Sequence, residues 1–142
     1  MAIRKSTMQE QVAEAIAQIN PGDRPIATIH TVTGPSPWLI NSLGAIAQLF
    51  VKYYFVTVTE QAVVFHKAGR MSARPKALVV AIPRNEAAAL VSDVKRKAVW
   101  SSLKFQLPGE AKPTRLNVAR YWRPELDQWV PAVTGTPVTA SS

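Results

Sequence analysis

The sequence predicts a mainly β domain with a helix at each end, and three observations carry this prediction. The stretch 52–83 contains three consecutive strand-like runs rich in Val, Phe, Tyr and Ile, which fit a half-buried pleated surface. Further short runs follow at spacings of about 8 to 12 residues, which is typical of a sandwich or barrel. The segment 124–133 carries an apolar stripe at helical spacing. We therefore expect a curled antiparallel sheet closed by a helix.

The first predicted helix covers residues 7–19. Thr7 and Glu10 have the spacing of a capping box, and Ser6 with Gln9 is the alternative. The Asn-Pro-Gly-Asp stretch that follows ends the helix, because Pro lacks a backbone donor and Gly readily adopts left-handed angles. Its apolar residues form a narrow stripe at helical spacing: Met8, Val12, Ile16 and Ile19.

A helical insert is predicted between the first two strands. The first strand is expected at 25–33, and the segment 36–50 then changes to helical periodicity. A pair of apolar strands broken at Gly44 remains the alternative, because short apolar runs are ambiguous. Polar residues interrupt the segment too often for the roughly 20 apolar residues of a membrane span, although an interfacial helix stays open. The other strands are expected at 53–59, 62–68, 76–83, 88–98, 101–107 and 114–120.

The last predicted helix begins at Pro124, a residue well suited to the first helical turn. Glu125 and Asp127 complement the positive end of the helix dipole. Pro131 is expected to limit this helix to roughly two turns or to kink it, because an interior Pro costs about 3 kcal/mol. Its apolar stripe is predicted to be structural and consists of Leu126, Trp129, Val130 and Val133.

Length and composition indicate one domain. The 142 residues divide into an N-terminal helix and linker (1–23), the main domain (24–133) and a polar, flexible tail (134–142). The chain has no cysteine, which excludes disulfides, thiolate zinc sites and cysteine nucleophiles. The N-terminus turns polar at once and lacks the apolar core of a secretory signal. We therefore expect a cytoplasmic protein.

The charge favours anionic contacts. The 17 basic and 9 acidic residues give a net charge of +8, which suits phosphates or anionic surfaces but also serves solubility. Lys67, Arg70, Arg74 and Lys76 cluster around one strand connection and are predicted to form an anion-facing rim. The alternative is that these charges only keep sheet edges from pairing. Trp38 leads the helical insert and is predicted to face a partner, and the alternative is that the insert docks over an open end of the sheet.

A second basic run and the candidate catalytic groups give weaker signals. In a strand, Lys95 and Lys97 share one face while Arg96 takes the other, so this run forms one patch only in a loop. His30 and His66 lack the further ligands that a metal site needs. Glu125 and Asp127 lie on different faces of a helix, and the chain contains no nucleophile elbow or phosphate loop. We expect no catalytic activity, no cofactor and no metal.

The order of elements over 26–133 resembles that of bacterial pleckstrin-homology-like (PH-like) domains of the actinobacterial type. The residues that carry the resemblance are the strand YYFVTVTE and Trp129 on the closing helix. The resemblance implies a partly open barrel of about seven antiparallel strands closed by a C-terminal helix. The leading helix, the insert and Pro131 depart from a minimal domain of this family. Its basic lipid-binding motif is not recognisable in TGPSPWLINSLG.

The resemblance implies a noncatalytic binding or scaffolding module that contacts a protein partner or an anionic surface. A structural component of a larger assembly, possibly phage-derived, is the first alternative. A nucleic-acid-binding protein is the second, supported by the charge but without a recognisable recognition helix or stacking platform. The oligomeric state is left open by the sequence.

Overall fold

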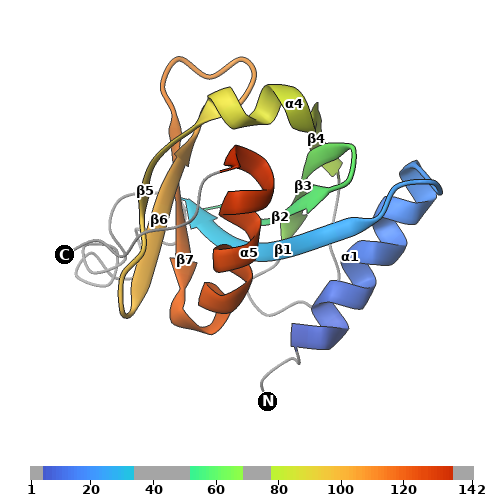
Figure 1. Ribbon diagram of the computed structural model, residues 1–142, viewed down its shortest axis with the longest axis horizontal. Helices are drawn as coiled ribbons and strands as arrows, with labels where there is room; N and C mark the ends of the chain where they lie inside the picture. Colours follow the sequence, from blue (N-terminus) through green and yellow to red (C-terminus); the bar gives the residue numbers. More distant parts are fainter. Residues whose placement is uncertain (1–4, 34–51, 69–77, 136–142) are drawn as a thin grey trace.

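The computed structural model describes residues 5–33, 52–68 and 78–135. It confirms the mainly β fold: seven antiparallel strands form one curled sheet, a half-barrel in the order β4-β3-β2-β1-β7-β6-β5 (Figure 1). The strands are β1 (Pro25–Thr33), β2 (Tyr53–Thr59), β3 (Ala62–Ala68), β4 (Leu78–Pro83), β5 (Val91–Lys95), β6 (Trp100–Phe105) and β7 (Thr114–Ala119). The helices are α1 (Lys5–Ile19), α4 (Arg84–Ala87) and α5 (Arg123–Thr134), with 3-10 turns η1 (Ala88–Leu90) and η2 (Arg120–Trp122).

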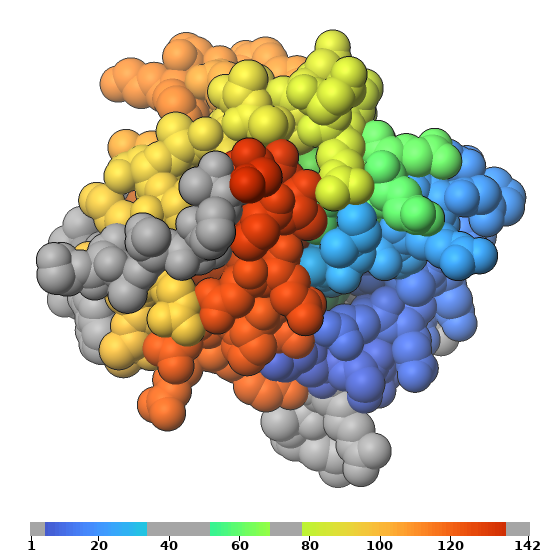
Figure 2. All heavy atoms as spheres, in the orientation of Figure 1, coloured from blue at the N-terminus to red at the C-terminus, as the bar shows by residue number. Residues whose placement is uncertain are grey.

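Two helices pack against the sheet from the ends of the chain. Figure 1 shows α5 crossing β1, the middle strand, and α1 running beside the same strand. On the face drawn in Figure 2, α5 (red) lies at the centre, between α4 (yellow-green) and α1 (dark blue). Strands β4 and β5 are the two ends of the described sheet. The predicted closing helix is therefore present, and the half-barrel keeps two strand edges.

The sheet buries side chains on both faces of its strands β1, β2 and β3. The register pairs Ile29 with Val56 and Val56 with Phe65, which places these three on one face, and the Phe65 ring lies 5.0 Å from that of Phe105. The opposite face carries Phe55 and Val64 and is covered by α1, whose inward side chains are Val12 and Ile16. Apolar residues dominate these strands because both of their faces are buried.

The predicted structural residues of the closing helix are buried. Trp129 and Leu126 are fully inaccessible to solvent, and Val130 and Val133 are nearly so. The helix is nevertheless longer than predicted, because it continues through Pro131 to Thr134. Pro131 loses only the one bond that its N–H would have donated to the carbonyl of Asp127, and the buried Val133 holds the turn that follows against the core. Gly135 then ends the helix with φ of 74°, and its N–H donates to the carbonyl of Pro131 at 2.8 Å.

Two other predictions on helix and strand bounds were wrong. The segment 88–98 was expected to be one strand, but it opens with η1, which follows directly on α4, and only Val91–Lys95 is strand. The Ala-rich sequence after Pro83 has strong helix propensity, and Pro suits a helix start. The predicted capping pairs also fail, because α1 begins by Lys5 and already includes Ser6 and Thr7. The predicted insert at 36–50 lies outside the described residues.

Candidate partner-binding groove

An apolar groove of about 260 Å³ lies between the C-terminal end of α1 and strands β3 and β4. This volume is slightly below the roughly 300–1,000 Å³ of typical small-molecule sites. The groove is therefore better matched to one apolar side chain than to a cofactor. Its apolar lining is Ile16, Ile19, Ala62, Val64, Ala81 and Pro83, and its polar lining is Asn20, Asp23 and Gln61.

A buried carboxylate closes the polar end of the groove. Asp23 is only 8% exposed and accepts hydrogen bonds at Oδ2 from the Thr59 hydroxyl (2.6 Å) and at Oδ1 from the backbone N–H of Arg24 (3.0 Å) and Gln61 (3.2 Å). Asn20 donates to the Gln61 side chain at 3.0 Å. These bonds fasten the loop after α1 to the β2–β3 turn, so Asp23 holds the groove in shape and has little capacity left for a ligand.

Exposed apolar side chains lie on the rim of the groove and at the start of the strand β4 that lines it. Ile19, on its rim, keeps 52% of its surface exposed, and Leu78 and Val79 on the adjoining edge strand β4 keep 44% and 42%. Leu78 pairs with His66, on the strand face that carries Val64 and the groove. Single exposed apolar residues are ordinary, but neighbouring ones beside an apolar groove indicate an interaction surface.

A second, wider depression of about 630 Å³ lies between the β2–β3 turn, α4 and the end of α5. Arg84 crosses it, because its Nε donates to the carbonyl of Ala132 at 3.0 Å and its Nη1 lies 3.5 Å from that of Glu60. The guanidinium therefore ties α5 to the β2–β3 turn. We assign this depression a structural role.

The predicted anion-facing rim falls mostly outside the described part of the chain. Lys67 is exposed near the end of β3, and none of the ion pairs among the described residues includes it. Arg70, Arg74 and Lys76 lie within 69–77, and Trp38 lies within 34–51, so their predicted roles stay predictions.

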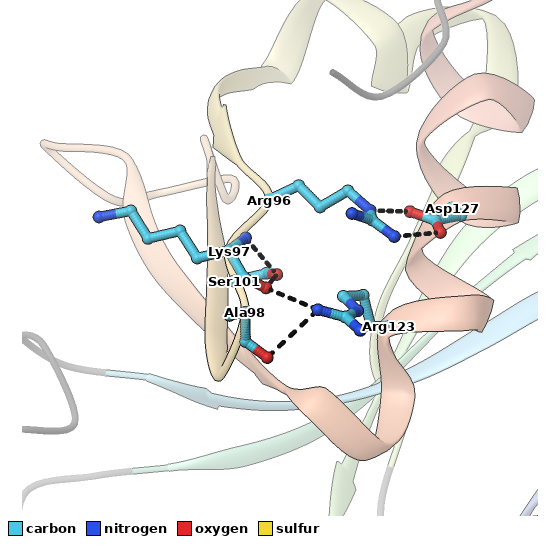
Figure 3. Close-up of polar contacts among 6 residues, drawn as sticks. All are labelled: Arg96, Lys97, Ala98, Ser101, Arg123 and Asp127. Carbon is cyan, nitrogen blue, oxygen red and sulfur yellow. Dashed lines mark hydrogen bonds and ion pairs between the residues drawn. The ribbon is translucent and has the colours of Figure 1, made fainter. Parts of the chain in front are cut away.

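The second basic run does not converge on one patch. Arg96 makes two bonds to Asp127 of α5, at 2.7 and 3.0 Å, and its hydrogen bond to that carboxylate raises its pKa (Figure 3). Arg123 donates through Nη1 to the carbonyls of Lys97 (3.3 Å) and Ala98 (3.2 Å). Figure 3 shows the Lys97 side chain pointing away from both arginines. Arg96 and Arg123 therefore fasten the β5–β6 turn to α5.

The acidic residues of α5 act as anchors for other segments. Glu125 pairs with Lys5 of α1 at 2.8 Å, and the Lys5 ammonium also lies 4.6 Å from the ring centre of Tyr121. Asp127 holds Arg96 as described above. Both carboxylates thus have partners in addition to the helix dipole that the sequence suggested.

The two histidines have different surroundings. His30 packs among aromatic rings, with centroids 5.2 Å from Phe55 and 6.2 Å from Trp122. His66 is buried at 2% exposure, and neither of its ring nitrogens has a hydrogen-bond partner within 5–33, 52–68 or 78–135. Burial lowers the pKa of His66 because it disfavours the charged form. The described residues contain no group of three or more His, Cys, Asp or Glu side chains that could hold a metal ion.

Comparisons with protein families, with curated proteins and with solved structures gave no match to this chain. Over 5–33, 52–68 and 78–135, no helix combines the length and the hydropathy needed to cross a membrane.

Sequence reasoning missed the groove. The sequence places Ile19 on a helix stripe and Asp23 in a helix stop, whereas the fold brings both to the groove that Ala81 also lines. The contact between Asp23 and Thr59 joins positions 36 residues apart, and no local pattern reports such a pairing. One signal was present: the run LVVAIP carries no charge, although strands at sheet edges usually do.

Proposed function

We propose that this chain is a noncatalytic binding or scaffolding module whose partner is a protein, bound at the groove between α1, β3 and β4. The observation that carries the proposal is an apolar groove of side-chain size that exposed Ile19 lines, next to the edge strand β4, which carries exposed Leu78 and Val79. An apolar patch beside a pocket is the usual form of a protein-docking surface. The cytoplasm is the compartment that we propose.

Site-specific photo-cross-linking in the native cell tests this function. A photoreactive residue at Ile19 is compared with one at Lys112, an exposed position in the connection between β6 and β7. We expect a discrete cross-linked protein from position 19 and none from position 112. Ile19→Asp should abolish co-purification of that protein, because a charge would be placed beside apolar surface. Identical products from both positions would contradict the proposal.

An anionic surface remains the second candidate, favoured by the net charge of +8 and by the exposed Lys67, which makes no ion pair with another described residue. The cross-linking experiment separates the two, because nuclease treatment or removal of membranes would leave a protein adduct unchanged. An adduct that disappears with nuclease would support the nucleic-acid-binding alternative. A structural role in a larger assembly would appear as several different adducts in one large complex.

A further inference from the structure

The two ends of the sheet are protected to different degrees. At the β5 edge, Asp93 has φ of 49° in an irregular register, and its carboxylate lies within 3.8 Å of Lys95 and 3.5 Å of Lys104. Distorted backbone and charged side chains of this kind prevent a sheet edge from pairing with another chain. The β4 edge has an irregular register only at its start and carries no charged residue in Leu78–Pro83. Of the two edges of the described sheet, the β4 edge is therefore the less protected and the one better suited to pairing.

The hydrogen bonds of β3 and β4 show which backbone groups face outward. The N–H of Arg84 donates to the carbonyl of Gln61 at 2.9 Å. Antiparallel pairs alternate between bonded and non-bonded, so the bonded positions of β4 are Ile82 and Val80. In this alternation Pro83 occupies a non-bonded position, so its missing N–H costs no hydrogen bond to β3. The N–H and carbonyl of Ala81 therefore point away from β3, toward the free edge.

Ala81 also lines the groove, so the free edge and the groove meet at one residue. A residue placed opposite Ala81 in an added antiparallel strand would have its side chain on the same sheet face as the Ala81 methyl group. That face carries Val64 and leads to Ile16 and Ile19 of α1. The small size of Ala81 leaves the path from the edge into the groove open.

We propose that the partner binds by strand addition: an extended segment of another protein pairs with β4 and inserts one apolar side chain into the groove. This inference rests on the proposed function and adds the binding mode and the chemistry of the bound segment. Main-chain bonds at Ala81 supply pairing, and the groove supplies selectivity for a large apolar side chain.

Charge identifies the partner as an acidic segment and not as a second copy of the chain. Two copies, each with a net charge of +8, repel one another, whereas an acidic segment is attracted. Lys67 is exposed near the N-terminal end of β4, next to the residue that pairs with Leu78, and has no ion-pair partner among the described residues. The bound segment should therefore have an apolar, uncharged centre with Asp or Glu beside it.

Fluorescence anisotropy with synthetic peptides tests the inference. The probe is a nine-residue peptide with a Thr-Val-Phe-Val-Thr centre and two acidic residues at each end. Its matched controls carry Lys in place of the acidic residues, or an N-methyl group on the central Phe. We expect the acidic peptide to bind the intact chain more weakly as salt rises. Both control peptides should bind roughly tenfold more weakly or worse.

Variants of the protein test the main-chain pairing at the β4 edge. Ala81→Pro removes the outward N–H without removing a bond to β3, and edge strands tolerate Pro at such positions. We expect this substitution to weaken binding of the acidic peptide roughly fivefold to tenfold. Ala81→Ser, which keeps the N–H, is the control and should bind nearly as the parent does. If Ala81→Pro melts far below the parent, N-methylation of the peptide tests the same bond with the protein unchanged.

The results can overturn the binding mode without overturning the proposed function. Equal binding of the N-methylated and unmodified peptides would show that no main-chain pairing occurs. The absence of binding by the acidic peptide at millimolar concentration would also overturn the inference. A concentration-dependent dimer that Ala81→Pro abolishes would make a second copy the occupant. If a photoreactive residue at position 19 gives no discrete cross-linked protein in the cell, the proposed function itself is contradicted.

Discussion

Replacing Trp129 by Ala should remove a large part of the stability of this domain. The side chain is fully buried and shares one stripe of α5 with Leu126, Val130 and Val133. A buried aromatic side chain removes about 150–250 Å² from water, which at about 25 cal/mol per Å² corresponds to about 4–6 kcal/mol. Because Ala retains part of this burial, the expected loss is about 3–5 kcal/mol.

The indole N–H of Trp129 moves the estimate toward the lower end of that range. Its Nε1 is buried and has no hydrogen-bond partner in the part of the chain that the structure describes, and such a donor costs about 1–3 kcal/mol. The Ala variant relieves this cost while it leaves a cavity. Trp129→Phe also removes the unsatisfied donor but keeps most of the apolar contact. We therefore expect the Phe variant to be much more stable than the Ala variant, and within about 1.5 kcal/mol of the parent.

Urea unfolding followed by far-ultraviolet circular dichroism measures both variants without relying on tryptophan fluorescence. A total stability of about 5–15 kcal/mol is usual, so the Ala variant should unfold at much lower urea and melt roughly 10 °C earlier. The slope with urea should be unchanged if the denatured state is unaffected. An Ala variant that melts within a degree or two of the parent would refute the reasoning that Trp129 anchors α5 to the sheet.

Two further predictions concern titratable groups. The lowered pKa of His66 means that the unfolded chain takes up a proton first as pH falls below the ordinary value of 6.5, so stability should decline from there toward the folded-state pKa. In His66→Phe, the free energy of unfolding should depend less on pH below about 6.5 than in the parent, and an unchanged dependence would show that His66 is not its source. Asp127→Asn should lower the melting temperature only slightly, because both partners of the pair with Arg96 are partly exposed, and the difference from the parent should shrink in high salt. A difference that does not depend on salt would assign the effect to hydrogen-bond geometry.

Residue chemistry was sufficient to predict the strands that bury both faces. The bounds predicted for β1, β2 and β3 are those of the structure, because β-branched and aromatic runs between turn residues leave little choice. The stripe of Leu126, Trp129 and Val130 predicted the closing helix, because helical spacing directs all three side chains to one side. Prediction failed at 84–90, where a strand-like interpretation competed with Ala-rich helix propensity.

The sequence by itself determined the fold class, the central strands and the buried stripe of α5, because each depends on side chains close together in the chain. The tertiary structure decided which strands became the sheet edges and that Ile19, Asp23 and Ala81 meet at one groove. It also decided that Arg96 and Arg123 form the hydrogen bonds that hold the β5–β6 turn against α5. These outcomes depend on the register between strands and on the placement of α1, which join residues that are distant in the sequence and leave no local periodic signal.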